Sequence, residues 1–291
     1  KGTLHELLAE RARMMGDRRA YTFEGKEGDV TITFAELDLR ARAIGAALQN
    51  HVQPGDRVML LFHAGLDFIS SFFGCLYAGA LAVPTTYPKP RRPMPRLTAI
   101  ARNCNAVAAL TDSETLSTID KTITASELPE MKWLGVDSIP DESATKLKPL
   151  PSHATDPGLA FLQYTSGSTS DPKGVMVSHA NLLHNLEMIR QGFGLRSISE
   201  GGEIQTGVFW LPAYHDMGLI GGILESLYVG GHSVLMSPAA FLQRPMGWLE
   251  SMSKHCAAIS GAPNFAYELC VARSTVEQRR ELDLSNWRVA F

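Results

Sequence analysis

Residues 159–179 read LAFLQ, YTSGSTSDPKG and VMVSH, so a polar turn at 164–174 lies between two apolar stretches that predict strands. Gly167 can take backbone conformations that other residues avoid, which lets neighbouring amide N–H groups converge on an anion. A loop of this composition suits a polyphosphate. Its hydroxyl donors are Thr165, Ser166, Ser168 and Thr169.

Lys173 adds a positive charge to this turn, and Pro172 fixes the backbone just before it. A charge-assisted hydrogen bond is roughly twice as strong as a neutral one, which favours a lysine here over another serine. The alternative is a plain surface loop rich in serine and glycine. The ordered composition of the turn favours the anion site.

Two common motifs are absent from the sequence. The usual nucleotide loop, GxxxxGK[ST], places Ser or Thr directly after Gly-Lys, whereas here Lys173 precedes Gly174 and Val175. The GxSxG elbow of many serine hydrolases is also missing. The turn therefore indicates a different kind of phosphate loop.

On both sides of this segment, short apolar runs alternate with helical patterns. Residues 57–62 (RVMLLF) form a continuous apolar run typical of a strand that is covered on both faces, and a helix over 66–77 follows. The repeated βαβ rhythm predicts an α/β fold of stacked, mainly parallel sheets with helices on both faces. Further helices are expected at 37–48 and 95–103, and further strands at 81–84, 106–110, 159–163, 175–177, 207–211, 233–236 and 257–259.

The stretch 111–157 is richer in Ser, Thr, Pro and charge, and it ends in PLPSHATDPG. We predict a boundary there. A first α/β subdomain is expected over 1–156, and a second over 157–291 that carries the phosphate loop.

Composition excludes several classes of protein. A chain of 291 residues with 45% hydrophobic residues can bury one or two cores, and a net charge of −3 provides no basic field for nucleic acid. The apolar run at 68–84 is punctuated by Gly74 and Gly79, so we predict a buried helix and strand there and no membrane span. Neither a signal peptide nor paired cysteines are evident, and we expect a cytoplasmic protein with reduced thiols.

The segment YTSGSTSDPKGVMVSHANLLHN resembles the phosphate loop of the adenylate-forming (acyl-activating) superfamily, and within it looks most like the fatty acyl-AMP ligases. Three other segments agree, at 66–90, 209–231 and 237–270. The resemblance therefore spans nearly the whole chain and implies the N-terminal region of that fold. The motifs expected further along such enzymes, and their C-terminal domain, would fall after Phe291, so we expect a truncated chain that is incomplete as an enzyme.

The resemblance also assigns site residues. His215 corresponds to the histidine beside the reacting carboxylate and α-phosphate, and with Lys173 it is the expected catalytic pair. A histidine among aromatic residues can also be a buried structural residue, but the neighbouring WLP and DMG favour the site. The residues after 260 can equally be a plain loop. The ATP phosphates are assigned to Thr165, Ser166, Gly167, Ser168, Thr169, Lys173 and Gly174, and the acid substrate to His215, Asp216, Met217, Gly218, Gly261, Ala262, Pro263 and Asn264.

The implied reaction is attack of a fatty carboxylate on the α-phosphorus of ATP, which gives acyl-AMP and pyrophosphate. Magnesium is expected to be held through the phosphates, with no metal ligands from this chain. The implied acceptor is an acyl carrier protein of a polyketide, nonribosomal peptide or lipid pathway. Two alternatives stay open, a long-chain acyl-CoA synthetase and a non-catalytic lipid- or nucleotide-binding module.

Overall fold

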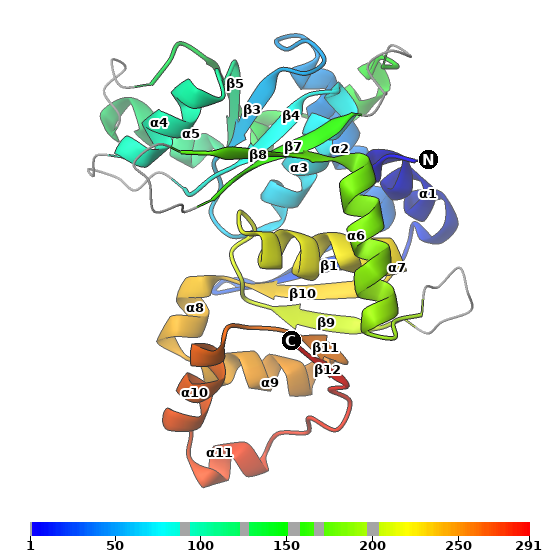
Figure 1. Cartoon of the computed structure of the whole chain (residues 1–291), viewed down its shortest axis with the longest axis vertical. Coiled ribbons are helices and arrows are strands. Elements are labelled where there is room, and N and C mark those ends of the chain that lie inside the picture. Colours follow the sequence, from blue (N-terminus) through cyan, green and yellow to red (C-terminus); the bar gives the residue numbers. More distant parts are fainter. Residues whose placement is uncertain (1, 88–93, 123–127, 151–157, 166–171, 197–203) are drawn as a thin grey trace. The chain divides into compact units, whose positions relative to one another are not determined.

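The computed structural model describes residues 2–87, 94–122, 128–150, 158–165, 172–196 and 204–291 (Figure 1). The chain divides into two compact units that each draw on separate segments. The first unit comprises residues 1–13, 35–63 and 67–183, and the second comprises 14–34, 64–66 and 184–291. The predicted boundary between residues 156 and 157 lies outside the described residues and stays a prediction.

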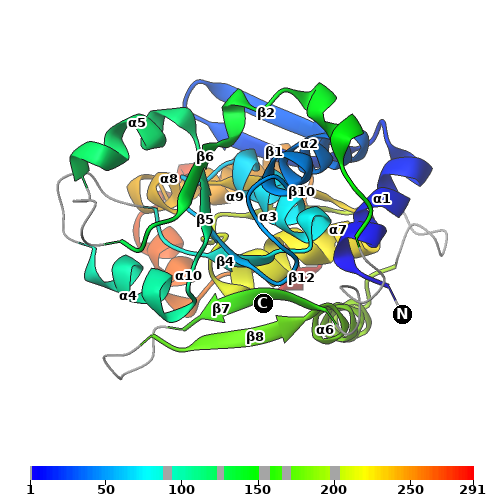
Figure 2. The same ribbon diagram turned by 90° about the horizontal axis from the view of Figure 1, so that it is seen from above.

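The first unit is built on a six-stranded sheet of order β6-β5-β3-β4-β7-β8. All neighbouring strands are parallel except β7 and β8, which run antiparallel and side by side in Figure 2. The strands are β3 (Arg57–Leu60), β4 (Leu81–Pro84), β5 (Ala108–Thr111), β6 (Lys132–Gly135), β7 (Leu159–Tyr164) and β8 (Gly174–Ser178).

Helices cover both faces of this sheet. On one face, Leu97 and Ile100 of α4 pack with Met59 and Val83 in a buried apolar cluster. On the other face, Phe72 of α3 meets Phe161 of β7 with ring centroids 5.8 Å apart. The helices are α1 (Leu4–Met15), α2 (Phe34–Leu48), α3 (Leu66–Ala78), α4 (Pro95–Asn103), α5 (Ser113–Thr122) and the 3₁₀ turns η1 (Val136–Ser138) and η2 (Asp141–Lys146).

The second unit has its own six-stranded sheet, of order β12-β11-β9-β10-β1-β2. Only the β1–β2 hairpin is antiparallel, and β1 joins the sheet through a parallel pairing with β10. The strands are β1 (Arg19–Gly25), β2 (Gly28–Thr33), β9 (Thr206–Phe209), β10 (His232–Met236), β11 (Ile259–Ser260) and β12 (Val289–Ala290).

Successive side chains of β9 and β10 point to opposite faces of this sheet, and the two faces make different contacts. Val208 and Val234 face a cluster that contains Trp248 of α9. Ser233 points the other way and donates a hydrogen bond to the carbonyl oxygen of Gly222 at 2.7 Å. Figure 1 shows η5–α7 on one side of β9 and β10 and α9 on the other. The helices are α6 (His179–Gly192), the π-helix η5 (Met217–Leu224), α7 (Glu225–Val229), α8 (Pro238–Gln243), α9 (Met246–Lys254), α10 (Asn264–Ala272) and α11 (Val276–Arg280).

This architecture confirms the predicted α/β class of mainly parallel sheets with helices on both faces. The helix expected at 95–103 and the strand expected at 81–84 are found with those bounds. The β1–β2 hairpin and β6 were not predicted. None of the described helices is both long enough and apolar enough to cross a membrane.

Candidate functional site

The predicted phosphate loop leaves the first sheet at the end of β7 and returns at the start of β8. Tyr164 and Gly174 are partners in the antiparallel ladder, and the Thr165 amide donates to the carbonyl oxygen of Lys173 across 3.5 Å. Thr165 and Lys173 are exposed, while Gly174 is half-buried. The stem of the loop is therefore closed. The remaining predicted residues, Ser166, Gly167, Ser168 and Thr169, lie outside the described residues.

Two side chains of α4 hold this stem. The Arg96 guanidinium donates to the carbonyl oxygen of Thr165 at 2.8 Å, and the Tyr164 hydroxyl donates to Oδ1 of Asn103 at 2.6 Å. Gly174 lies so close to Tyr164 that an added Cβ would be 2.8 Å from its ring. The sequence pattern did not single out Arg96 or Asn103, because their role depends on α4 packing beside β7.

The predicted acid-binding segment begins where β9 ends. Trp210 is buried and stacks on Phe241 with ring centroids 3.9 Å apart. The chain then turns, and the amide of His215 donates to the carbonyl oxygen of Pro212 at 3.1 Å. The His215 side chain is exposed. The histidine is thus held by its backbone at the tip of a fixed turn, and the alternative of a buried structural histidine is wrong.

The π-helix η5 starts directly after this histidine. Asp216 caps it, since its Oδ1 accepts from the Met217 amide at 2.8 Å. Gly218 is buried against the preceding turn, where an added Cβ would lie 2.2 Å from the carbonyl oxygen of Pro212. π-Helical turns are rare in proteins and are found frequently at functional sites.

The predicted segment Gly261 to Asn264 follows β11. Gly261 is packed against Phe291, whose ring would be 2.5 Å from an added Cβ, and the Ala262 amide donates to the Phe291 carbonyl oxygen at 2.8 Å. Pro263 and Asn264 are exposed at the start of α10. The structure therefore brings the first two of these residues to Phe291, and the other two face away from the buried interior.

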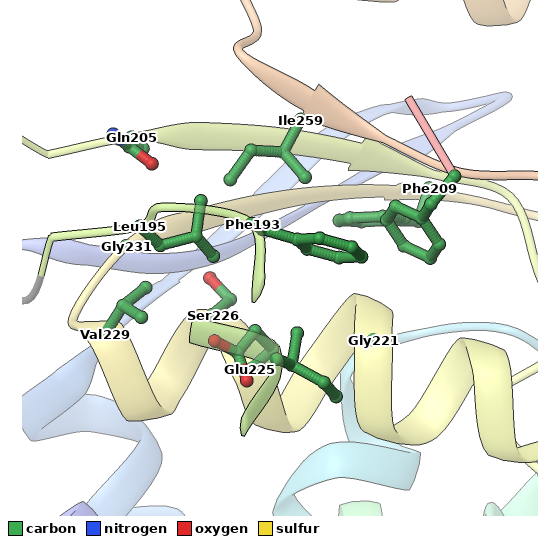
Figure 3. Close-up of a pocket in the computed structure, with 13 residues that line it drawn as sticks. Phe193, Leu195, Gln205, Phe209, Gly221, Glu225, Ser226, Val229, Gly231 and Ile259 are labelled. Atoms are coloured by element: carbon green, nitrogen blue, oxygen red, sulfur yellow. The ribbon is translucent and has the colours of Figure 1, made fainter. Parts of the chain in front are cut away.

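A small apolar pocket lies between η5–α7 and the sheet of the second unit (Figure 3). Its cavity has a volume of about 20 Å³, room for roughly one water molecule. Aromatic rings fill much of the space, since the Phe291 ring centroid is 5.0 Å from that of Phe193 and 6.2 Å from that of Phe209. The lining residues are Ile189, Phe193, Leu195, Gln205, Gly207, Phe209, Gly221, Glu225, Ser226, Val229, Gly231, Ile259 and Phe291.

One carboxyl group lines this pocket. Glu225 is only 5% exposed, and no described residue donates a hydrogen bond to either of its oxygens. Burial and, to a smaller extent, the nearby Glu187 charge raise the pKa of Glu225 to about 8, against a lowering effect of Arg190. Glu187 itself is held by Arg190, Gln191 and Tyr228, and these hydrogen bonds lower its pKa to about 2. Glu225 was not among the predicted site residues, although an acidic residue directly after the apolar run LIGGIL is a visible signal.

The Glu225 pKa predicts a pH-dependent stability. Because the folded-state pKa of about 8 lies above the ordinary value of 4.5, the folded protein holds a proton that the unfolded chain releases. The free energy of unfolding is therefore expected to fall as pH rises from about 4.5 to 8. Glu225→Gln removes this loss, and should be more stable than wild type at pH 8 by about 4 kcal/mol, with a much smaller gain at pH 5.

Urea unfolding of both proteins at the two pH values measures this difference. Comparing the two proteins at each pH cancels the titration of the groups that do not interact with Glu225. A stability difference that is the same at pH 5 and pH 8 would show that Glu225 is ionised in the fold.

Comparison with known proteins agrees with this architecture. The chain belongs to the family of AMP-binding enzymes, whose family profile matches residues 8–291. It is 42% identical over 295 residues to the medium-chain-fatty-acid–[acyl-carrier-protein] ligase JamA of Moorena producens, with 99% of this chain and 48% of the relative covered. It is 37% identical to the long-chain-fatty-acid–AMP ligase FadD32 of Mycolicibacterium smegmatis, with 94% and 44% covered.

A solved structure is similar over the same region. The fatty acyl-adenylate ligase from L. pneumophila, in complex with acyl adenylate and pyrophosphate, superimposes with a TM-score of 0.90 and 40% identity, covering 99% of this chain and 49% of that one. The predicted family resemblance is confirmed by these matches. The chain spans about half the length of these relatives.

Proposed function

We propose that the protein carrying this chain activates a fatty acid with ATP and passes the acyl group to an acyl carrier protein. A carboxylate oxygen of the fatty acid forms a bond to the α-phosphorus of ATP, the bond from that phosphorus to the bridging oxygen breaks, and pyrophosphate leaves. The observation that carries the proposal is the exposed Lys173 on a closed loop stem, in a chain 42% identical to a medium-chain-fatty-acid–[acyl-carrier-protein] ligase.

The reaction needs neutralisation of charge more than proton transfer. A fatty carboxylate is already ionised at neutral pH, so no general base is required. The barrier falls when positive charge and N–H donors surround the phosphates. In this proposal, Lys173, Thr165 and Gly174 contact the phosphates together with Ser166, Gly167, Ser168 and Thr169.

The second unit supplies the proposed acid site. We assign His215 to a position beside the reacting carboxylate. The acyl chain is assigned to the apolar pocket between η5–α7 and the sheet of the second unit, called here the pocket behind η5. Each buried methylene contributes about 0.8 kcal/mol, so a deeper pocket favours a longer acid. Because the cavity holds only about 20 Å³, the phenylalanine rings must turn aside when the chain enters. Asp216, Met217, Gly218, Gly261, Ala262, Pro263 and Asn264 are proposed to shape this site.

Magnesium is proposed to arrive with ATP, bound to its phosphate oxygens. Among the described residues, no group of three His, Cys, Asp or Glu side chains is placed to hold a metal ion. When bound, the ion would neutralise phosphate charge.

We further propose a cytoplasmic setting. In the described part of the chain the four cysteines are free, with Cys75, Cys104 and Cys270 buried. Unpaired thiols are typical of a reducing compartment.

Fatty-acid-dependent exchange of radiolabelled pyrophosphate into ATP tests the activation step in the whole protein. Exchange is expected with at least one saturated fatty acid and none without acid. The acceptor is then identified by supplying either a phosphopantetheinylated carrier protein or free coenzyme A. Formation of acyl-CoA alone would replace the carrier-protein proposal with an acyl-CoA synthetase, and failure of every fatty acid to support exchange would overturn the activation proposal itself.

A further inference from the structure

The pocket behind η5 is chemically uneven along its length. Figure 3 shows Phe209 and Gly221 toward one end and Gln205 and Val229 toward the other, with the side chains of Glu225 and Ser226 rising from the helix between them. Apolar and aromatic groups therefore line the part nearer the start of η5. Three of the lining side chains further along, Gln205, Glu225 and Ser226, can form hydrogen bonds.

The Glu225 carboxyl lines this pocket without a hydrogen-bond partner among the described residues. Its two oxygens are buried and accept no hydrogen bond from any described residue. Nearby donors already have other partners, since Arg190 donates to Glu187 at 2.8 Å and the Tyr228 hydroxyl donates to Glu187 at 2.9 Å. An unpaired buried carboxyl destabilises a fold, so a carboxyl that pairs with no described residue and lines a pocket is a candidate to pair with a ligand.

A plain hydrocarbon chain does not supply that partner. If a saturated acyl chain filled the pocket, methylene groups would lie against Glu225 and exclude the water that could otherwise solvate it. A chain with a hydroxyl at that depth would accept from or donate to the carboxyl in either protonation state. A site that pairs with a substrate hydroxyl also discriminates strongly against the analogue that lacks it.

We propose that the acyl pocket selects a fatty acid that carries a hydroxyl group near the far end of its chain, and that Glu225 is the residue that recognises this hydroxyl. The inference rests on the proposed function, because it takes the carboxylate end to react beside His215. Glu225 lies nine positions after Asp216, at the far end of the eight-residue π-helix η5. The hydroxyl is therefore remote from the carboxylate and not at its α or β carbon.

The test compares matched acids on one protein. In the whole protein, pyrophosphate exchange is measured for straight-chain acids from hexanoic to palmitic and for the ω-hydroxy acid of each length. The ω-hydroxy acid is expected to have the higher kcat/KM, by about tenfold or more, at one or two chain lengths. The result is expressed as the kcat/KM for the ω-hydroxy acid divided by the kcat/KM for the plain acid of the same length. Because both values come from one preparation, the fraction of folded protein cancels from this ratio.

Variants of Glu225 assign the preference to this residue. Glu225→Gln keeps a donor and an acceptor and is expected to keep the preference for the hydroxy acid. Leucine has a similar size but neither a hydrogen-bond donor nor an acceptor. Glu225→Leu is therefore expected to lower the ratio of kcat/KM values, hydroxy acid to plain acid, to one or below.

The outcomes separate this inference from the proposed function. Exchange with plain acids but no hydroxyl preference at any length overturns the inference and leaves the function standing, as does a preference that Glu225→Leu retains. Should Glu225→Leu fail to fold, the wild-type ratios and those of Glu225→Gln still decide. No exchange with any acid of either series overturns the function.

Discussion

Lys173→Ala is expected to lower kcat/KM for ATP in pyrophosphate exchange by about a hundredfold, while the protein stays folded. The ammonium group is exposed, and no described carboxylate pairs with it. We therefore expect its charge to be available for an anion. Removing one preorganised donor from a charged transition state typically costs 10²- to 10³-fold in rate, and the phosphates here carry that charge.

The fold should not depend on this side chain. The link between the two ends of the loop stem runs from the Thr165 amide to the Lys173 carbonyl oxygen, which alanine retains. Thermal unfolding is thus expected to be unchanged in Lys173→Ala. Met176, 67% exposed on β8 three residues after Lys173, gives a matched control, because Met176→Ala removes a long side chain without removing charge.

Lys173→Arg separates charge from shape. A guanidinium keeps the charge but is planar, so it is expected to restore only part of the activity. If Lys173→Ala exchanged pyrophosphate as fast as wild type, the turn would have no role in holding the phosphates, and the assignment of the whole loop would be wrong.

Local sequence pattern was enough to predict the parallel core of this fold. Strands such as β3 and β4 are short and buried, so they appear as continuous apolar runs, and α4 appears as a clear 3.6-residue period. These signals are read from neighbouring residues alone. The order of strands in each sheet has no such local signal.

The β1–β2 hairpin shows why part of the fold was missed. Most of β2 is exposed, so it lacks an apolar pattern. β1 is fixed by partners more than 200 residues away, with Tyr21 beside Ser233 in the ladder and the Tyr21 hydroxyl donating to the Ile223 carbonyl oxygen at 2.8 Å. Contacts between such distant segments cannot be read from a single sequence.

The candidate site also has one part that local sequence predicts and another that depends on packing. The loop and the YHDMG turn are continuous in sequence, so motif resemblance located them. The Arg96 contact to Thr165 and the place of Glu225 in the pocket arise only when separate elements pack together. Local motifs therefore predicted the residues assigned to the reaction, and tertiary packing revealed those that position the loop and line the pocket.

Gly218→Ala is expected to destabilise the second unit and to impair activation of the acid together. An added Cβ would lie 2.2 Å from the carbonyl oxygen of Pro212 and 3.1 Å from that of Leu211. Both neighbours are backbone atoms, so no side chain can rotate away. Overpacking of a buried position costs about 1–3 kcal/mol, and this contact is closer than most.

Relief of that clash must move either η5 or the turn before it. The turn carries His215, whose amide donates to the same Pro212 oxygen. If the Pro212 carbonyl oxygen moves to relieve its overlap with the added Cβ, His215 moves with it. A misplacement of about 1 Å of a group that acts in the reaction can lower the rate 10²-fold. The loss should appear in kcat for the acid and in the midpoint of urea unfolding.

Gly192→Ala is the matched control for this effect. Gly192 is the last residue of α6, and an added Cβ would meet nothing within 4 Å. Alanine is favoured over glycine in a helix by up to about 1 kcal/mol, so this variant is expected to be as stable as wild type or slightly more so. If Gly218→Ala matched Gly192→Ala in both measurements, the close packing of η5 on the Pro212 turn could not be what positions His215, and the histidine would have to be held by contacts to the substrate itself.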